Sequence, residues 1–119
     1  MKHKYRTYKN GITGHRYKRY YIANQGRKDY SVLDPSGEMV RSKLLSYEDA
    51  EWEIDKITAT PVERQVMEKL YKEDINTLQG LLIKAIGKQN DPVANSPENT
   101  LFVNMVTKIR TRKTEGKEF

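Results

Sequence analysis

Residues 17–50 read YKRYYIANQGRKDYSVLDPSGEMVRSKLLSYEDA, and this stretch carries the signals that decide the fold. Residues 17–23 are rich in tyrosine, which suits the pleated surface of a strand. Residues 24–26 (NQG) indicate a turn. Residues 34–37 (DPSG) indicate another, because proline presets φ and glycine tolerates positive φ. We therefore expect residues 17–45 to form an antiparallel sheet with turns near Gly26 and Gly37.

A further hairpin is indicated upstream by Asn10-Gly11. Both residues tolerate the positive φ that a type I′ turn requires. The sheet is therefore expected to contain three or four strands.

Helices are expected over the rest of the chain. Ser46 is a typical N-cap, and apolar residues at helical spacing follow it, which predicts a helix over residues 47–57. Residues 60–63 (TPVE) form a capping-box pattern that predicts a long helix over residues 61–86, with Gly87 as its C-terminal cap. Ser96-Pro97 predicts a last helix over residues 97–110. Strands followed by helices indicate the α+β class.

The length of 119 residues predicts one domain. Its expected parts are a basic, tyrosine-rich sheet (residues 1–45), a helical part (46–110) and a flexible tail (111–119). The chain has no Cys, so it forms no disulfide or thiolate zinc site. No apolar run is long enough to cross a membrane. These features predict a cytoplasmic protein without membrane partners.

The net charge of +6 is unevenly distributed. Residues 1–45 contain eleven Lys or Arg and three Asp or Glu, whereas residues 46–95 contain six basic and ten acidic side chains. Such segregation concerns partners rather than fold. A polyanion is the natural partner of the first segment, and a solvated basic face without any partner is the alternative.

Catalytic and metal-binding patterns are weak. His3 and His15 lie among basic residues, which repel a metal cation, and solvent-exposed histidine is the expected state of both. The acids on the helix expected over residues 47–57 are more simply a solvated face than a catalytic carboxylate pair. We expect no enzyme activity, no cofactor and no metal.

Tyrosine and basic residues alternate near the N-terminus, as is typical of surfaces that neutralise phosphates and stack bases. If Tyr20 and Ile22 face the helix together with Tyr30, Val32 and Leu44, the other sheet face is basic and aromatic. The residues expected to bind nucleic acid are Arg16, Tyr17, Arg19, Tyr21, Arg27, Arg41 and Lys43. The other candidate is the N-terminal arm with Lys2, Lys4, Arg6 and Lys9.

Residues 16–57 resemble the three-stranded-sheet-plus-helix module of AP2-type DNA-binding domains and of the arm-binding domains of tyrosine integrases. The resemblance rests on residues 20–22 (YYI), residues 30–37 (YSVLDPSG) and residues 46–50 (SYEDA), and covers about a third of the chain. It implies a sheet that lies in the major groove of DNA, with basic strand residues on phosphates and bases. The first strands lack the dense Arg and Trp pattern of those families. Nothing after residue 57 is similar to an integrase catalytic region.

The sequence therefore predicts a small basic accessory protein of a phage or mobile element, which binds nucleic acid, in particular duplex DNA, through its N-terminal sheet. Its helices would act as support or as a dimer surface. The alternative is a protein-binding module or inhibitor that uses its helices and Trp52 as anchors. We expect Trp52 to be core, at the junction between the first helix and the long helix.

Overall fold

The computed structural model describes residues 5–7 and 13–119, with the side chains from residue 14 onward. It divides the chain into two compact units, Met1–Ala59 and Thr60–Phe119. The sequence predicts one domain with an internal division after residue 45, whereas the first helix belongs to the same unit as the sheet. The Asn10-Gly11 turn lies outside the described residues. In the described part of the chain, no helix is both long and apolar enough to cross a membrane.

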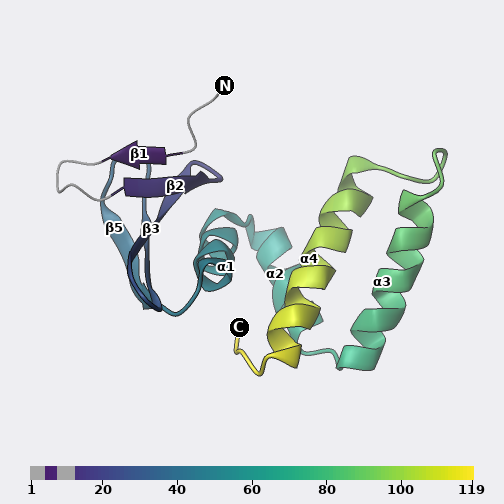
Figure 1. Ribbon diagram of the computed structural model, residues 1–119. Coiled ribbons are helices and arrows are strands. Elements are labelled where there is room, and N and C mark those ends of the chain that lie inside the picture. The colour runs from purple at the N-terminus through teal and green to yellow at the C-terminus, as the bar shows by residue number, and fades with distance from the viewer. Residues whose placement is uncertain (1–4, 8–12) are drawn as a thin grey trace. The chain divides into compact units, whose positions relative to one another are not determined.

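The first unit contains a five-stranded antiparallel sheet whose strands follow one another in chain order (Figure 1). The α+β class and the antiparallel sheet are thus confirmed, with one strand more than expected. The strands are β1 (Tyr5–Thr7), β2 (Thr13–Tyr17), β3 (Tyr20–Gly26), β4 (Asp29–Leu33) and β5 (Met39–Leu44).

The prediction of a single strand over residues 17–23 is wrong. Tyr17 ends β2 and pairs with Tyr20, which begins β3, so Lys18 and Arg19 alone form the loop between them. Their φ angles are 46° and 68°, as in a type I′ turn, whose twist matches that of the flanking strands. Asn and Gly usually occupy these positions, so a Lys-Arg pair carries no sequence signal for the turn.

The two turns expected near glycine are confirmed. Gly26 ends β3, and Gly37 has a φ of 94° in the β4–β5 turn. A carboxylate oxygen of Asp34 accepts from the Ser36 hydroxyl at 2.6 Å and from the backbone N–H of Glu38 at 2.9 Å. These donors hold the pKa of Asp34 below its usual value.

Helix α1 (Tyr47–Thr58) covers one face of the sheet. Ser46 caps it by accepting from the Asp49 N–H at 3.1 Å, as expected. The core between helix and sheet confirms the face that the sequence assigns to Tyr20, Ile22, Tyr30, Val32 and Leu44. Its buried members are Ile22, Val32, Ala50 and Ile54, with Tyr17, Tyr20, Tyr30, Val40, Leu44 and Tyr47 packed around them.

The opposite face of the sheet is also buried at its centre. Ala23, Ser31 and Leu33 alternate with the core residues along β3 and β4, and all three are fully buried. Gly14 on β2 packs so closely that a Cβ added there would lie 2.7 Å from the Cβ of Tyr21. Strands β3 and β4 therefore offer no open platform at this point.

The second unit consists of α2 (Pro61–Tyr71), α3 (Ile75–Gln89) and α4 (Pro97–Thr114). The capping box at Thr60 and Glu63 is confirmed. A single helix over residues 61–86 is wrong, because Asp74 accepts from the Thr77 N–H at 2.7 Å and caps a new helix. Gly87 lies inside α3, and Asn90 is the C-cap.

The C-terminal residues contact α2, and their expected flexibility stays a prediction. Helix α4 continues four residues beyond its expected end, to Thr114. The Tyr71 hydroxyl donates to the Lys117 carbonyl at 2.5 Å, and the Phe119 ring meets the Tyr71 ring edge to face at 5.5 Å. The Lys113 ammonium donates to the Tyr71 carbonyl at 2.7 Å, which satisfies an unpaired helix end.

Trp52 is buried, with 2% of its surface exposed. Its expected position at a junction with the long helix stays a prediction. Trp52→Ala should lower the free energy of unfolding by about 3–5 kcal/mol, as the loss of a large buried aromatic does. Thermal and urea denaturation measure this, with the exposed Leu45→Ala as a control within about 0.5 kcal/mol. An unchanged melting temperature would contradict the burial of Trp52.

Arg19→Gly should raise the free energy of unfolding by about 1 kcal/mol, because glycine adopts positive φ without the Cβ clash that an L side chain suffers. Arg16→Gly in the middle of β2 is the matched control. It removes the same charge from an extended residue and should destabilise the protein. A loss of stability in Arg19→Gly would show that the arginine side chain stabilises the turn.

Candidate nucleic-acid interface

The structure separates the seven residues expected to bind nucleic acid. Tyr17 is not on an exposed sheet face. Its hydroxyl donates to the Asp55 carboxylate of α1 at 2.8 Å, and the Lys18 ammonium lies 2.7 Å from the same oxygen. Because the turn begins directly after Tyr17, its side chain shares the face of Tyr20 and contacts the core.

Arg41 is also directed toward α1. Its Nε lies 3.2 Å from the Glu53 carboxylate and a terminal nitrogen donates to the Val40 carbonyl at 2.7 Å. The pairing of β4 with β5 shifts register on both sides of Val32, and such irregularities change which side chains face outward. The simple alternation that groups Arg41 and Lys43 with Arg19 therefore does not hold.

Arg16, Arg19 and Tyr21 lie elsewhere on the sheet. Arg16 is exposed and pairs across β2 and β3 with the half-buried Tyr21, on the face opposite α1. Arg19 is exposed in the β2–β3 turn, at the end of β3 opposite to the β3–β4 turn. These three residues do not share a surface with Arg27.

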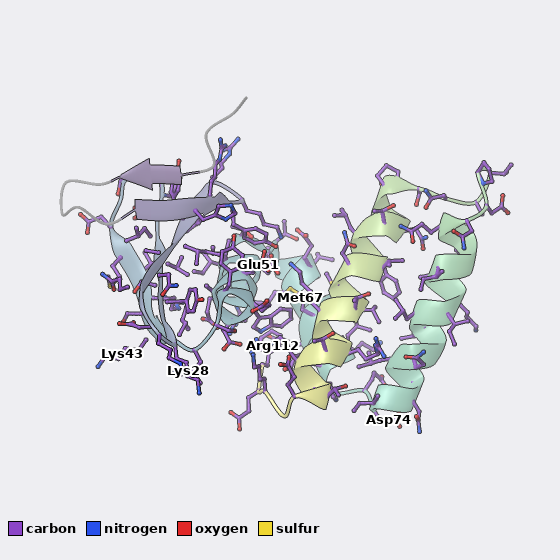
Figure 2. The ribbon with its side chains drawn as sticks, viewed as in Figure 1. Lys28, Lys43, Glu51, Met67, Asp74 and Arg112 are labelled. Carbon is purple, nitrogen blue, oxygen red and sulfur yellow. The ribbon has the colours of Figure 1, made fainter. Side chains whose placement is uncertain are left out.

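Arg27 and Lys43 do come together, and Lys28 joins them. Arg27 and Lys28 form the β3–β4 turn, while the pairing of Tyr30 with Leu44 brings the end of β5 to the same end of the sheet. Figure 2 shows Lys28 and Lys43 there. All three side chains are exposed, and none forms an ion pair within residues 14–119. We call Arg27, Lys28 and Lys43 the basic edge.

The backbone of the basic edge is unusual. Lys28 has a φ of 58° and Lys43 a φ of 57°. This left-handed region is costly for side chains with a Cβ and is rarely occupied by lysine. Lys28 is the residue that sequence reasoning missed, although its adjacency to Arg27 after Gly26 was the available signal.

A shallow, widely open hollow of about 790 Å³ includes Arg27 and Lys28 of the basic edge in its lining. It lies entirely within the first unit, between the β3–β4 turn and the start of α1. Its lining combines cations, amide side chains, two tyrosine rings and one carboxylate. The lining residues are 24–28, Tyr30 and 45–48.

Two carboxylates of α1 are paired with cations that do not belong to the basic edge. Asp55 is occupied by Lys18, and Glu53 lies within 3.2 Å of Arg41 and 2.8 Å of Lys56. Asp29 follows Lys28 directly, and Glu48 lines the hollow together with Arg27 and Lys28. Three cations against these two carboxylates give this end of the sheet a net positive charge.

No group of three or more His, Asp or Glu side chains suited to a metal occurs in the part of the chain that the structure describes. His15 is half-buried rather than solvated, since its Nδ1 is hydrogen-bonded to the Tyr47 hydroxyl. His3 lies outside the described residues.

Comparison of the chain with protein-family models, curated proteins and solved structures finds no match. The resemblance of residues 16–57 to AP2-type and integrase arm-binding domains therefore stays a prediction. The case for function rests on the site itself.

The hydrogen bond from Tyr17 to Asp55 should make the free energy of unfolding depend on pH. Burial, and then the Asp55 charge, raise the pKa of the Tyr17 phenol above its ordinary value of 10.0. The neutral phenol thus stabilises the fold fully below pH 10, and this contribution falls above pH 10 as tyrosine ionises in the unfolded chain. Tyr17→Phe should remove that component, so its unfolding free energy should fall less steeply between about pH 10 and 11 than that of the wild type.

Urea denaturation at a series of pH values measures the two slopes. Tyr20→Phe is the matched control, because Tyr20 packs on the same core without a carboxylate partner among the described residues. Parallel pH profiles of Tyr17→Phe and the wild type would show that the Tyr17 phenol has no raised pKa.

Proposed function

We propose that this protein binds nucleic acid through the basic edge of its first unit. The observation that carries the proposal is the convergence of Arg27, Lys28 and Lys43, three exposed cations without an ion-pair partner among the described residues. Lysine and arginine in such positions neutralise phosphates and release condensed counterions. The proposed function is binding without catalysis.

The proposed surface differs from the sheet face that the sequence predicts. Tyr17 and Arg41 are bonded to carboxylates of α1, so they are poorly placed to contact phosphates. The burial of Ala23, Ser31 and Leu33 argues against laying the centre of the sheet into a major groove. The basic edge instead projects from the end of the sheet, where a backbone can approach it.

The wider role proposed for the chain is that of an accessory protein of a phage or mobile element acting in the cytoplasm. Small size, lysine-rich composition and the absence of Cys favour it. The N-terminal lysines Lys2, Lys4 and Lys9 lie outside the described residues.

A second candidate function is binding of a partner protein through the helices. The burial of Trp52 removes the anchor that the sequence suggests. The second unit nevertheless exposes large apolar side chains, among them Val62, Ile83 and Leu101, with 62–70% of their surfaces accessible. Apolar side chains of this kind mark a protein-binding surface where they form one contiguous patch.

The direct test measures the affinity for a random duplex and for a random single strand at a series of salt concentrations. Fluorescence anisotropy of the labelled nucleic acid reports the binding. If all three cations contact phosphates, the slope of log affinity against log salt should be about −2.7 on duplex and about −2.1 on a single strand. The double variant Arg27→Ala/Lys43→Ala should flatten the slope by about 1.8 and about 1.4, respectively.

Arg16→Ala/Arg19→Ala is the matched control, since it removes the same charge from exposed positions outside the basic edge. It should keep the wild-type slope. An equal loss in both double variants would show a nonspecific effect of net charge and refute the basic edge as the site. Absence of any binding at about 50 mM salt would refute the proposed function and leave the partner-protein candidate in front.

A further inference from the structure

Two tyrosines are among the residues that line the shallow hollow at the basic edge. Tyr30 and Tyr47 both line it, and both rings are half-buried because they pack on the core beneath. The Tyr47 hydroxyl is tied to His15, so this side chain is held in one place. Rings that are already immobilised lose little conformational freedom when a planar group packs against them.

The amide side chain of Asn24 in the hollow is oriented by an internal hydrogen bond. The Asn24 side-chain oxygen accepts from the Gly26 N–H at 3.2 Å, whereas the Gln25 side chain bonds the Ser31 hydroxyl on the opposite face of the sheet at 3.2 Å. The Asn24 NH₂ group has no partner among the described residues and remains as a donor. Glu48 is a carboxylate acceptor in the same lining.

A ligand that offers only phosphates would contact the cations of the basic edge and leave the tyrosine rings and the amide donor without a partner. Cations at the rim suit phosphates, but tyrosine rings suit a planar ring, and an amide donor suits ring carbonyls. In a duplex, the bases are stacked and their Watson–Crick edges are paired, so neither the ring faces nor these edges reach such a hollow. An unpaired base in a single strand offers both.

We infer that the hollow lined by Asn24, Tyr30 and Tyr47 takes an unpaired, carbonyl-bearing nucleobase, so that the ligand of this protein is a single strand. This inference rests on the proposed function, because the basic edge must hold the adjacent phosphates. The strand then runs along Arg27, Lys28 and Lys43 with one base turned into the hollow.

Three probes of about twelve nucleotides test the inference: an oligothymidylate, an abasic strand with the same phosphates, and a duplex. The full chain should bind the oligothymidylate about tenfold more tightly than the abasic strand, the effect expected for one stacked base. It should also bind the oligothymidylate more tightly than the duplex. Equal affinity for the oligothymidylate and the abasic strand, or tighter binding of the duplex, would overturn the inference while the proposed function stands. No binding of any probe would overturn both.

Two variants separate base recognition from phosphate recognition. Asn24→Ala should weaken oligothymidylate binding about threefold and leave the abasic strand unchanged, because it removes only a base contact. Lys28→Ala should weaken both strands by the same factor. Asn104→Ala, an exposed asparagine on α4, is the matched control and should change neither affinity. Circular dichroism melting confirms that each variant is folded, and equal losses on both strands for Asn24→Ala would refute the base contact.

Discussion

The Asp55 carboxylate holds helix α1 to the sheet of the first unit. It is buried, and one of its oxygens accepts from the Tyr17 phenol at 2.8 Å and from the Lys18 ammonium at 2.7 Å. A buried charge is costly unless it is paired and hydrogen-bonded, and this one is both. The two donors come from the last residue of β2 and the first residue of the following turn. The interaction therefore favours the chain reversal at Lys18 and Arg19, where two consecutive residues have positive φ despite having a Cβ.

That reversal decides which side chains face the helix. With a two-residue turn, Tyr17 and Tyr20 pair across two strands, and their side chains lie on the same, core-facing side of the sheet. In one uninterrupted strand, these two side chains would point to opposite faces of the sheet. The register irregularities beside Val32 also change which side chains of β5 face the helix. As a result, Arg41 is directed toward Glu53 of α1. The ion pairs of α1 then neutralise basic residues on the helix side. A net positive charge is left at the other end of β3, where Arg27, Lys28 and Lys43 outnumber Asp29 and Glu48.

The candidate site is built from two segments of the chain that are separated by about twenty residues in the sequence. The β3–β4 turn supplies cations and amides, and the start of α1 supplies Tyr47 and Glu48. Antiparallel pairing of β4 with β5 brings them together, because the chain that leaves β5 enters α1 beside that turn. Tyr30 and Tyr47 both pack against the core and line the hollow. The stability of the first unit and the shape of its candidate site are thus coupled.

The sequence by itself determined the α+β class, the turns at Gly26 and Gly37, the capped starts at Ser46, Thr60 and Ser96, and the core face of Tyr20, Ile22, Tyr30, Val32 and Leu44. These features depend on local backbone preferences and on periodicity, which neighbouring residues express. Only the tertiary structure decided the Lys18-Arg19 turn, the packing of the C-terminal residues on α2 and the approach of Lys43 to the Arg27-Lys28 pair. Each of these depends on contacts between residues distant in the chain, and such contacts override local propensity without leaving a pattern in the sequence.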